Sequence, residues 1–319
     1  MLNPLVSVIA GCYNHEKWVK ICLDGIRCQT YPNIQLIIVD DFSTDDSVNQ
    51  ILEWIRVYQV ECIFIQNASN LGVCKTLNKA IELCTGEYIA CTSTDDLWDI
   101  DHIQSRIDVF MNSSSDTALV YGDVKCISEC GGLTGQLGST FLLFPDNIRE
   151  SSLDKILTEN FIWPVSVLFR KAHLIEIGKF DENLRYEDWD MYIRILKKFK
   201  CVYLNRNTSY YRLVSNSLSR RDHSGYINEA TLQLIYKHLT EGAWTKNQIR
   251  LMLKNYEKFS VYLFSINYPR FRKYLWKNFI ISRSVRSLFI YSLSYLFSYK
   301  FLSSFYKRNI FRFWFIRDN

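Results

Sequence analysis

Short apolar runs alternate with segments of helical spacing through the first 125 residues of the chain. The runs predict five strands, at Val6–Ala10, Ile34–Val39, Cys62–Ile65, Tyr88–Cys91 and Ala118–Tyr121. Between them, apolar residues three and four apart predict helices over His15–Cys28, through Ile51 to Ile55, over Leu71–Leu83 and from Asp101 to Met111. This order of elements is typical of βαβ units.

The strand segments are apolar throughout and do not alternate with polar residues. Strands of this kind are covered on both faces, which predicts an α/β fold with a parallel sheet between two helix layers. Ligands of such sheets bind beyond the carboxyl ends of the strands. We therefore expect one edge of the sheet to carry Gly11–Asn14, Asp40–Asp41, Asn67–Gly72 and Ser93–Asp96.

The remainder of the chain is mixed and then helical. Residues 125–150 contain a Gly-rich stretch and are interpreted as a loop. Further along, the pattern predicts a strand at Pro164–Arg170, a helix at Tyr186–Lys198, and short strands at Cys201–Leu204 and Tyr210–Leu213. From about Gly225 the spacing is helical to the end.

Composition and charge divide the chain. The net charge is +5, yet residues 240–319 hold 15 of the 38 basic residues, only three of the 33 acidic ones and 22 of the 48 aromatic ones. The ten cysteines form no C-x-x-C pair, which argues against zinc and against a disulfide framework and favours buried thiols in a reducing cytoplasm. The first residues lack a basic leader and a long apolar stretch, so no secretory signal is expected.

Two adjacent carboxylates, Asp95 and Asp96, directly follow an apolar strand. Neighbouring negative charges repel each other and are stabilised by water or a cation. Hard divalent cations such as Mn²⁺ and Mg²⁺ take oxygen ligands, usually one or two carboxylates together with phosphate oxygens and water. The alternative is that one of the pair caps a helix that starts near Leu97.

Five motifs occur in order between about residues 4 and 215. They are Val6–Ile9 with Tyr13–Asn14, Ile38–Asp45, Asn70–Gly72, Gly86–Ile89 with Asp95–Asp96, and Glu187–Asp190. Together they resemble the family-two glycosyltransferases of the GT-A fold, of the bacterial polysaccharide type. The resemblance implies a Rossmann-like central sheet with helices on both faces. It also implies a catalytic domain over 1–222, with a nucleotide-binding half (1–124) and an acceptor half (125–222), and a basic, aromatic-rich helical region over 223–319.

The resemblance also implies a site for a nucleotide-sugar donor, with UDP preferred and dTDP as the alternative. The residues expected to bind it are Gly11, Tyr13, Asp41, Asn70, Gly72, Lys75, Ser93 and Asp95. Asp41 is expected to accept a hydrogen bond from the base, since an ionised carboxylate only accepts and suits an imide N–H. A core position for Tyr13 and a solvated Lys75 are the alternatives.

A divalent cation, Mn²⁺ or Mg²⁺, is expected at Asp95 and Asp96, with the division of roles between them left open. The commonest family pattern here is Asp-x-Asp, and its first Asp aligns with Ser93. This departure leaves the cation with fewer protein ligands.

The motif Glu187–Asp190 supplies the expected catalytic residues. The resemblance implies that Asp188 is the general base that deprotonates the acceptor hydroxyl and that Glu187 orients the acceptor or Asp188. A single displacement of this kind inverts the anomeric carbon. The alternative is that these acids only favour the helix dipole, and Asp190 is expected to be structural. The segment Tyr210–Arg221 resembles the part that closes over the diphosphate, where Arg220, Arg221 or His223 either pair with phosphate or form a plain basic loop.

The tail Phe271–Phe315 interleaves basic and aromatic residues, and its apolar part Ser287–Ser298 is too short for a confident membrane span. This composition favours peripheral attachment to an anionic membrane surface, with a packed helical subdomain or an oligomer interface as alternatives. Its many large aliphatic residues argue against nucleic-acid binding.

The function expected is glycosyl transfer to a lipid-carrier-linked glycan in surface polysaccharide synthesis. The expected location is the cytoplasm, at the inner face of the plasma membrane. The rival functions are a nucleotidyltransferase, which should show a Gly-rich basic loop that Gly11–His15 lacks, and an inactive sugar-nucleotide-binding or scaffold protein, which Ser93 suggests.

Overall fold

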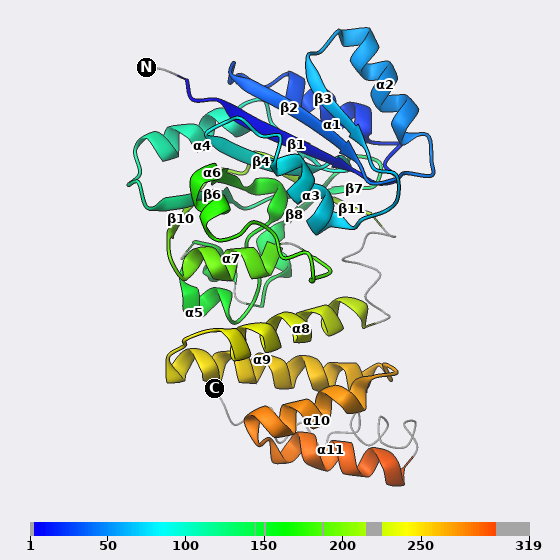
Figure 1. Ribbon diagram of the computed structural model, residues 1–319, viewed down its shortest axis with the longest axis vertical. Helices are drawn as coiled ribbons and strands as arrows, with labels where there is room; N and C mark the ends of the chain where they lie inside the picture. The colour runs from blue at the N-terminus through cyan, green and yellow to red at the C-terminus, as the bar shows by residue number, and fades with distance from the viewer. Residues whose placement is uncertain (1–2, 144, 150, 187, 215–224, 298–319) are drawn as a thin grey trace. The chain divides into compact units, whose positions relative to one another are not determined.

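The computed structural model describes residues 3–143, 145–149, 151–186, 188–214 and 225–297. The chain divides into two compact units, Met1–Ser215 and Asn216–Asn319 (Figure 1). The domain boundary predicted at residue 222 falls in the segment 215–224, outside the described residues. That boundary and the division into halves at residue 124 stay predictions.

A seven-stranded sheet forms the centre of the first unit, in the order β10-β6-β9-β4-β1-β2-β3. Its strands are β1 (Val6–Cys12), β2 (Ile34–Asp40), β3 (Cys62–Gln66), β4 (Tyr88–Ser93), β6 (Thr117–Gly122), β9 (Leu168–Arg170) and β10 (Lys200–Leu204). Neighbouring strands are parallel except at β9, which is antiparallel to both β4 and β6. The predicted parallel sheet is thus confirmed with one reversed strand.

Helices cover both faces of this sheet (Figure 1). The helices of the unit are α1 (Val19–Arg27), α2 (Ser47–Tyr58), α3 (Val73–Ile81), α4 (His102–Met111), α5 (Leu153–Ile156), α6 (Lys171–Glu176) and α7 (Asp188–Leu196). One core joins apolar residues of α1, α2 and α4 to alternate residues of β1, among them Val6 and Val8. Successive residues of a strand face opposite sides, so the buried Ile9 lies on the other face, where α3 packs on β1 and β2. The two predicted helix layers are confirmed.

A second, four-stranded sheet has the order β5-β11-β7-β8. Its strands are β5 (Leu97–Trp98), β7 (Lys125–Ser128), β8 (Leu133–Leu137) and β11 (Ser209–Leu213). The interpretation of residues 125–150 as a loop was therefore wrong, since β7 and β8 pair as antiparallel neighbours and two 3₁₀ turns follow (Gly138–Phe141 and Pro145–Arg149). Every residue of β8 is exposed, so no apolar pattern marks it in the sequence. The strand predicted at Pro164–Arg170 begins instead with a 3₁₀ turn, Pro164–Ser166.

The described part of the second unit consists of helices, as predicted. They are α8 (Tyr226–Glu241), α9 (Lys246–Ser265), α10 (Phe271–Ser282) and α11 (Val285–Leu296), and each packs on the next. The buried Glu229 of α8 accepts hydrogen bonds from the hydroxyls of Tyr268 and Tyr274 and from Arg270. Among the helices of the described residues, none has both the length and the apolar content needed to cross a bilayer.

Candidate functional site

The carboxyl ends of four neighbouring strands coincide at one edge of the large sheet. Gly11 pairs with Ser93, Cys12 pairs with Asp40, and Asp40 pairs with Gln66. The segments that leave these strands therefore start side by side. This register confirms the predicted edge.

Asp41, the first residue after β2, organises the turn that precedes α3. Its Oδ1 accepts hydrogen bonds from Asn67 Nδ2 at 2.9 Å and from the backbone N of Leu71 at 2.8 Å, and its Oδ2 accepts one from the backbone N of Gly72 at 2.9 Å. Gly72 has φ = 82° and ψ = 160°, a conformation that glycine adopts almost alone. A carboxylate accepts about four hydrogen bonds, so Oδ2 retains one acceptor direction.

Most of the other residues expected to bind the donor are exposed to solvent. Exposed side chains are those of Tyr13, Asn70, Lys75 and Ser93, and Gly11 is half-buried. With 44% of its surface exposed, Tyr13 is not a core aromatic, which removes that alternative. A Cβ atom added at Gly11 would meet only ordinary contacts, the nearest at 3.8 Å, so packing does not require glycine there.

Asp95 and Asp96 have different surroundings. The Oδ1 atom of Asp95 is buried and has no hydrogen-bond partner among the residues that the structure describes. Asp96 is 5% exposed, and its Oδ1 accepts from the backbone N of Arg212 on β11 at 2.8 Å. Burial, and next the charge of Asp95, raise the pKa of the Asp96 carboxyl well above its usual range, and the hydrogen bond and charge of Arg212 offset part of this. The Arg212 side chain also donates from Nε to the backbone O of Asp95 at 2.6 Å.

His15 is a residue of this site that the sequence analysis missed. Its Nε2 lies 3.8 Å from Asp95 Oδ2, and its Nδ1 lies 2.9 Å from the hydroxyl oxygen of Thr94. Its ring meets the ring of Trp18 edge-on, with centroids 6.0 Å apart. The position of His15 just after β1, at the edge where ligands bind, is the signal that could have found it.

Asp188 begins α7 and is held by two hydrogen bonds. Its Oδ2 accepts from Asn160 Nδ2 at 2.8 Å, and its Oδ1 accepts from the backbone N of Trp189 at 2.6 Å. Burial raises the pKa of the Asp188 carboxyl, and the bonds from Trp189 and Asn160 act in the opposite direction. Glu187 lies outside the described residues. Asp190 is buried and forms an ion pair with Arg194 at 2.7 Å, in line with the structural role expected of it.

The segment that carries Asn160 also reaches β11. Three residues on from Asn160, the ring of Trp163 packs against Tyr211, with centroids 5.0 Å apart. Tyr211 immediately precedes Arg212, the residue that holds Asp96. The sequence analysis missed the contacts of Asn160 and Arg212, because they join residues 28 and 116 positions apart. The candidates Arg220, Arg221 and His223, farther along, lie outside the described residues.

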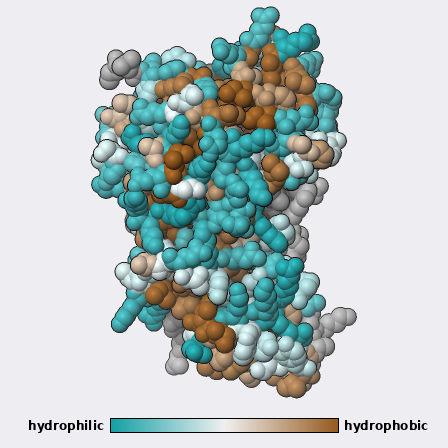
Figure 2. All heavy atoms as spheres, viewed as in Figure 1, coloured by the Kyte–Doolittle hydropathy of each residue, from teal (hydrophilic) through white to brown (hydrophobic). Residues whose placement is uncertain are grey.

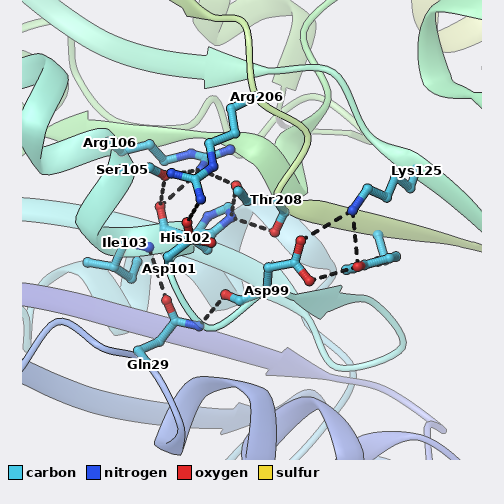
Figure 3. A network of polar contacts seen from close by, with 11 residues as sticks. Gln29, Asp99, Asp101, His102, Ile103, Ser105, Arg106, Lys125, Arg206 and Thr208 are labelled. Atoms are coloured by element: carbon cyan, nitrogen blue, oxygen red, sulfur yellow. Dashed lines mark hydrogen bonds and ion pairs between the residues drawn. The ribbon is translucent and has the colours of Figure 1, made fainter.

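A polar network fixes the start of β11 (Figure 3). The fully buried Arg106 of α4 donates from Nη1 to the Thr208 hydroxyl and from Nε to the backbone O of Ser166, both at 2.7 Å. Burial lowers the pKa of this guanidinium. Nearby, Asp99 pairs with Lys125 at 3.3 Å. Because Thr208 directly precedes β11, the network anchors the strand that positions Asp96.

The acidic and histidine side chains at this edge of the sheet are the groups that could bind a divalent cation. Within the described ranges, no three His, Cys, Asp or Glu side chains cluster as a complete metal site. The buried Oδ1 of Asp95, which has no hydrogen-bond partner in these ranges, is nevertheless an atom whose negative charge a cation would neutralise. The residues therefore fit a cation that takes few protein ligands and completes its shell with substrate oxygens and water.

Comparisons with known proteins agree with this geometry. The sequence profile of glycosyl transferase family 2 matches residues 7–177, which is more than half of the chain. Among similar curated proteins is the uncharacterized glycosyltransferase MJ1057 of Methanocaldococcus jannaschii, 26% identical over 78% of this chain and 82% of its own length. The putative teichuronic acid biosynthesis glycosyltransferase TuaG of Bacillus subtilis is 26% identical over 68% of this chain and 82% of its own length.

Similar solved structures include the mannosyltransferase PcManGT from Pyrobaculum calidifontis in complex with GDP-Man and Mn²⁺, with a TM-score of 0.63 and 16% identity over 95% of this chain and 84% of that one. Residues 1–349 of S. aureus TarS in complex with UDP-GlcNAc give a TM-score of 0.66 and 18% identity over 87% of this chain and 81% of that one. At these identities the likeness shows the fold, which is GT-A. Since the profile spans the strands and loops that form the acidic edge of the sheet, this chain belongs to glycosyl transferase family 2.

Proposed function

We propose that this protein is an inverting glycosyltransferase that moves a sugar from a UDP-sugar to a hydroxyl of a glycan acceptor. The observation that supports this most is the Asp95 carboxylate at the carboxyl edge of the sheet, whose buried Oδ1 has no hydrogen-bond partner within the described part of the chain. A carboxylate in this state suits a cation shared with a diphosphate. The family of the chain supplies the reaction class.

Asp95 is the carboxylate that we propose as a metal ligand. Asp96 is already bonded to Arg212 and buried, so the role proposed for it is to hold the Asp95 turn against β11. A bound Mn²⁺ or Mg²⁺ supplies Lewis-acid neutralisation of the departing diphosphate. Ser93, which is exposed, adds a neutral hydroxyl beside this carboxylate.

The nucleotide is proposed to lie over Gly11, Tyr13 and Asp41. The free acceptor direction of Asp41 Oδ2 suits the imide N–H of uracil, and thymine offers the same group. The exposed ring of Tyr13 offers a stacking surface, and Gly11 leaves room above the backbone. Asn70, Gly72 and Lys75 are proposed to contact the donor as well. They lie in and just after the turn whose backbone N–H groups donate to Asp41.

Asp188 is proposed as the general base. Burial raises the pKa of its carboxyl, which makes the carboxylate a stronger proton acceptor than an exposed aspartate. It would take the proton of the acceptor hydroxyl as that oxygen attacks the anomeric carbon opposite the leaving diphosphate. The C–O bond to the diphosphate breaks as the new glycosidic bond forms, so the configuration is inverted. Glu187 is proposed to orient the acceptor.

The acceptor is proposed to be a lipid-linked glycan, reached at an anionic membrane surface. Exposed apolar and aromatic side chains occur on α10 and α11, among them Trp276, Phe289 and Tyr295, with exposed Lys273 and Arg283 nearby. Figure 2 shows such hydrophobic side chains at the surface of the C-terminal helices. Basic residues and interfacial aromatics together favour a helix lying on anionic lipid. A location at the inner face of the plasma membrane and a role in surface polysaccharide synthesis belong to this proposal.

The test is UDP release by the purified full-length chain with Mn²⁺ and a panel of nucleotide sugars, combined with NMR of the anomeric proton of the product. We expect turnover with a UDP-sugar, an inverted product, and a loss of about 10²–10⁴-fold in Asp188→Asn with UDP binding retained. Asn112→Ala, an exposed change at the residue that follows α4, serves as the matched control. A product of retained configuration, or full turnover by Asp188→Asn, would overturn the mechanism. UDP-sugar binding without turnover for any acceptor would favour the inactive binding protein that Ser93 suggests.

A further inference from the structure

The side chains of His15 and Asp95 lie close together without a direct hydrogen bond. Their nearest side-chain atoms, Nε2 and Oδ2, are 3.8 Å apart, which is too long for a hydrogen bond. Both side chains are largely buried, with 17% and 15% of their surfaces exposed. We propose that His15 is a second protein ligand of the divalent cation, beside Asp95, and that it biases the site toward Mn²⁺ over Mg²⁺. This inference rests on the donor site proposed above and assigns it a ligand on a different loop.

The backbone of His15 is fixed before any cation arrives. Its N–H donates to the Ser47 hydroxyl at 2.8 Å, and its carbonyl accepts from the backbone N of Trp18 and of Val19, both at 2.9 Å. Ser47 is fully buried and is itself bonded to Asp45. The start of α2 thus fixes the backbone of the loop that leaves β1, and with it the position from which the imidazole extends.

The second ring nitrogen has the partner that a ligating histidine needs. Nδ1 lies 2.9 Å from the hydroxyl oxygen of Thr94, a residue with no exposed surface. In the tautomer that donates from Nδ1 to this hydroxyl, Nε2 carries no hydrogen, so its lone pair is free to bind a metal ion. Metal-bound histidines almost always donate their other N–H to a fixed acceptor in this way. Thr94 is therefore assigned as the residue that positions the ring.

The separation of the two facing atoms matches a shared cation. Two atoms that each bind one ion at about 2.1 Å lie between about 3 and 4 Å apart, depending on the angle at the ion. Among the residues that the structure describes, the buried Oδ1 of Asp95 has no hydrogen-bond partner, although the charge of Arg212 acts on this carboxylate. Ser93 offers only a neutral hydroxyl, which makes a nitrogen ligand from His15 the stronger donor on this side.

An imidazole ligand has a consequence for metal choice. Mg²⁺ strongly prefers oxygen, whereas first-row transition metals accept imidazole readily. If His15 binds the cation, its removal must lower the affinity for Mn²⁺ much more than the affinity for Mg²⁺. If His15 only interacts with Asp95 through its charge, its removal must change the two affinities alike.

The experiment measures binding of Mn²⁺ to the full chain with UDP present, by electron paramagnetic resonance of free Mn²⁺, and of Mg²⁺ by competition. We expect His15→Ala to lower the affinity for Mn²⁺ by at least about tenfold and the affinity for Mg²⁺ by clearly less. Thr94→Val should lower the affinity for Mn²⁺ about tenfold, because the imidazole loses its positioning hydrogen bond. Lys17→Ala, an exposed change two residues away, is the control. If His15→Ala does not fold, His15→Gln replaces it, since its amide is a poor substitute for the ring nitrogen.

Three results would overturn the inference. One is a Mn²⁺ affinity of His15→Ala within twofold of the original chain, and another is an equal loss of both cations. The third is an absence of Mn²⁺ binding in the original chain while UDP raises its melting temperature. Asp95→Asn separates this failure from a failure of the proposed function: if it abolishes Mn²⁺ binding and turnover while His15→Ala changes neither, the donor site stands and the role of His15 falls.

Discussion

The backbone N–H of Arg212 donates to the buried Oδ1 of Asp96 at 2.8 Å, and the side chain of the same arginine donates to the backbone O of Asp95 at 2.6 Å. One residue of β11 therefore holds both members of the acidic pair. The Nη1 group of Arg212 also bonds the carbonyls of Ser128 and Glu129 at 3.2 Å. Arg212 thus connects the small sheet to the edge of the large one.

Arg212→Lys is expected to lower both stability and turnover. A lysine keeps the charge but cannot donate to three carbonyls in a fixed plane. We expect the free energy of unfolding in urea to fall by about 1–3 kcal/mol. Arg206→Lys is the control, because Arg206 is 60% exposed and its ion pair with Asp101 is screened by water. Equal effects of the two substitutions would contradict the role given to Arg212.

Two glycines at the site are expected to respond differently to alanine. Gly72 has φ = 82°, and no atom of the described residues lies within 4 Å of an added Cβ, so Gly72→Ala costs backbone strain alone, about 1–3 kcal/mol. Gly11 has no such backbone requirement, so we expect Gly11→Ala to change stability by less than about 0.5 kcal/mol. If the base lies over Gly11, the same substitution lowers the affinity for UDP, which isothermal titration calorimetry measures. Unchanged affinity in a stable Gly11→Ala variant would remove the nucleotide from this position.

Removal of the Asn160 side chain is expected to shift the pH profile. A general base works when ionised, so turnover falls as the pH drops through the pKa of Asp188. Burial raises this pKa and the bond from Asn160 lowers it. Asn160→Ala should therefore move the acid limb of kcat/KM to higher pH, in contrast to Asn112→Ala. If activity falls equally at every pH and the acid limb of kcat/KM does not move, Asn160 stabilises the fold and does not influence the pKa of Asp188.

The same pKa shift affects stability in a definite direction. Because the folded state favours the protonated Asp188 carboxyl, its contribution to stability is complete at low pH and is lost as the pH rises through the raised pKa. Asp188→Asn removes this loss. Thermal unfolding followed between acidic and neutral pH should show a flatter dependence for Asp188→Asn than for the original chain. A variant that is equally pH-dependent would show that other groups dominate.

The exposed face of α10 and α11 is expected to bind anionic vesicles. The full chain should sediment with vesicles of phosphatidylcholine mixed with phosphatidylglycerol, less with phosphatidylcholine alone, and less at high salt because salt screens the basic residues. Phe289→Ser with Tyr295→Ser should reduce sedimentation, since these side chains are 53% and 63% exposed. Leu133→Ser is the control, a 68% exposed apolar residue of β8. Binding that is indifferent to lipid charge would contradict the proposal.

The sequence sufficed for the elements whose apolar patterns are strong. Continuous runs such as Ile34–Val39 predicted the parallel strands, and the rule for parallel sheets then predicted the edge that Asp41 and Asp95 share. It failed at β8, where every side chain is exposed, and where backbone pairing with β7 and a hydrogen bond from the Thr134 hydroxyl to the Cys126 carbonyl hold the strand. The contacts of His15 and Asn160 were also missed, because no local pattern records which side chains a fold brings together over 79 and 28 residues.

The reversal of β9 determines which edge of the large sheet its preceding segment reaches. Leu168 pairs with Ala90 and Arg170 with Tyr88, so β9 enters the sheet from the side toward which β4 runs. The residues before it, from Asn160 onward, therefore arrive at the same edge as Asp95, whereas a parallel strand would have sent them to the far edge. Insertions and deletions ahead of Leu168 can accordingly reshape the edge of the sheet that carries Asp95 while the parallel strands and their register stay intact.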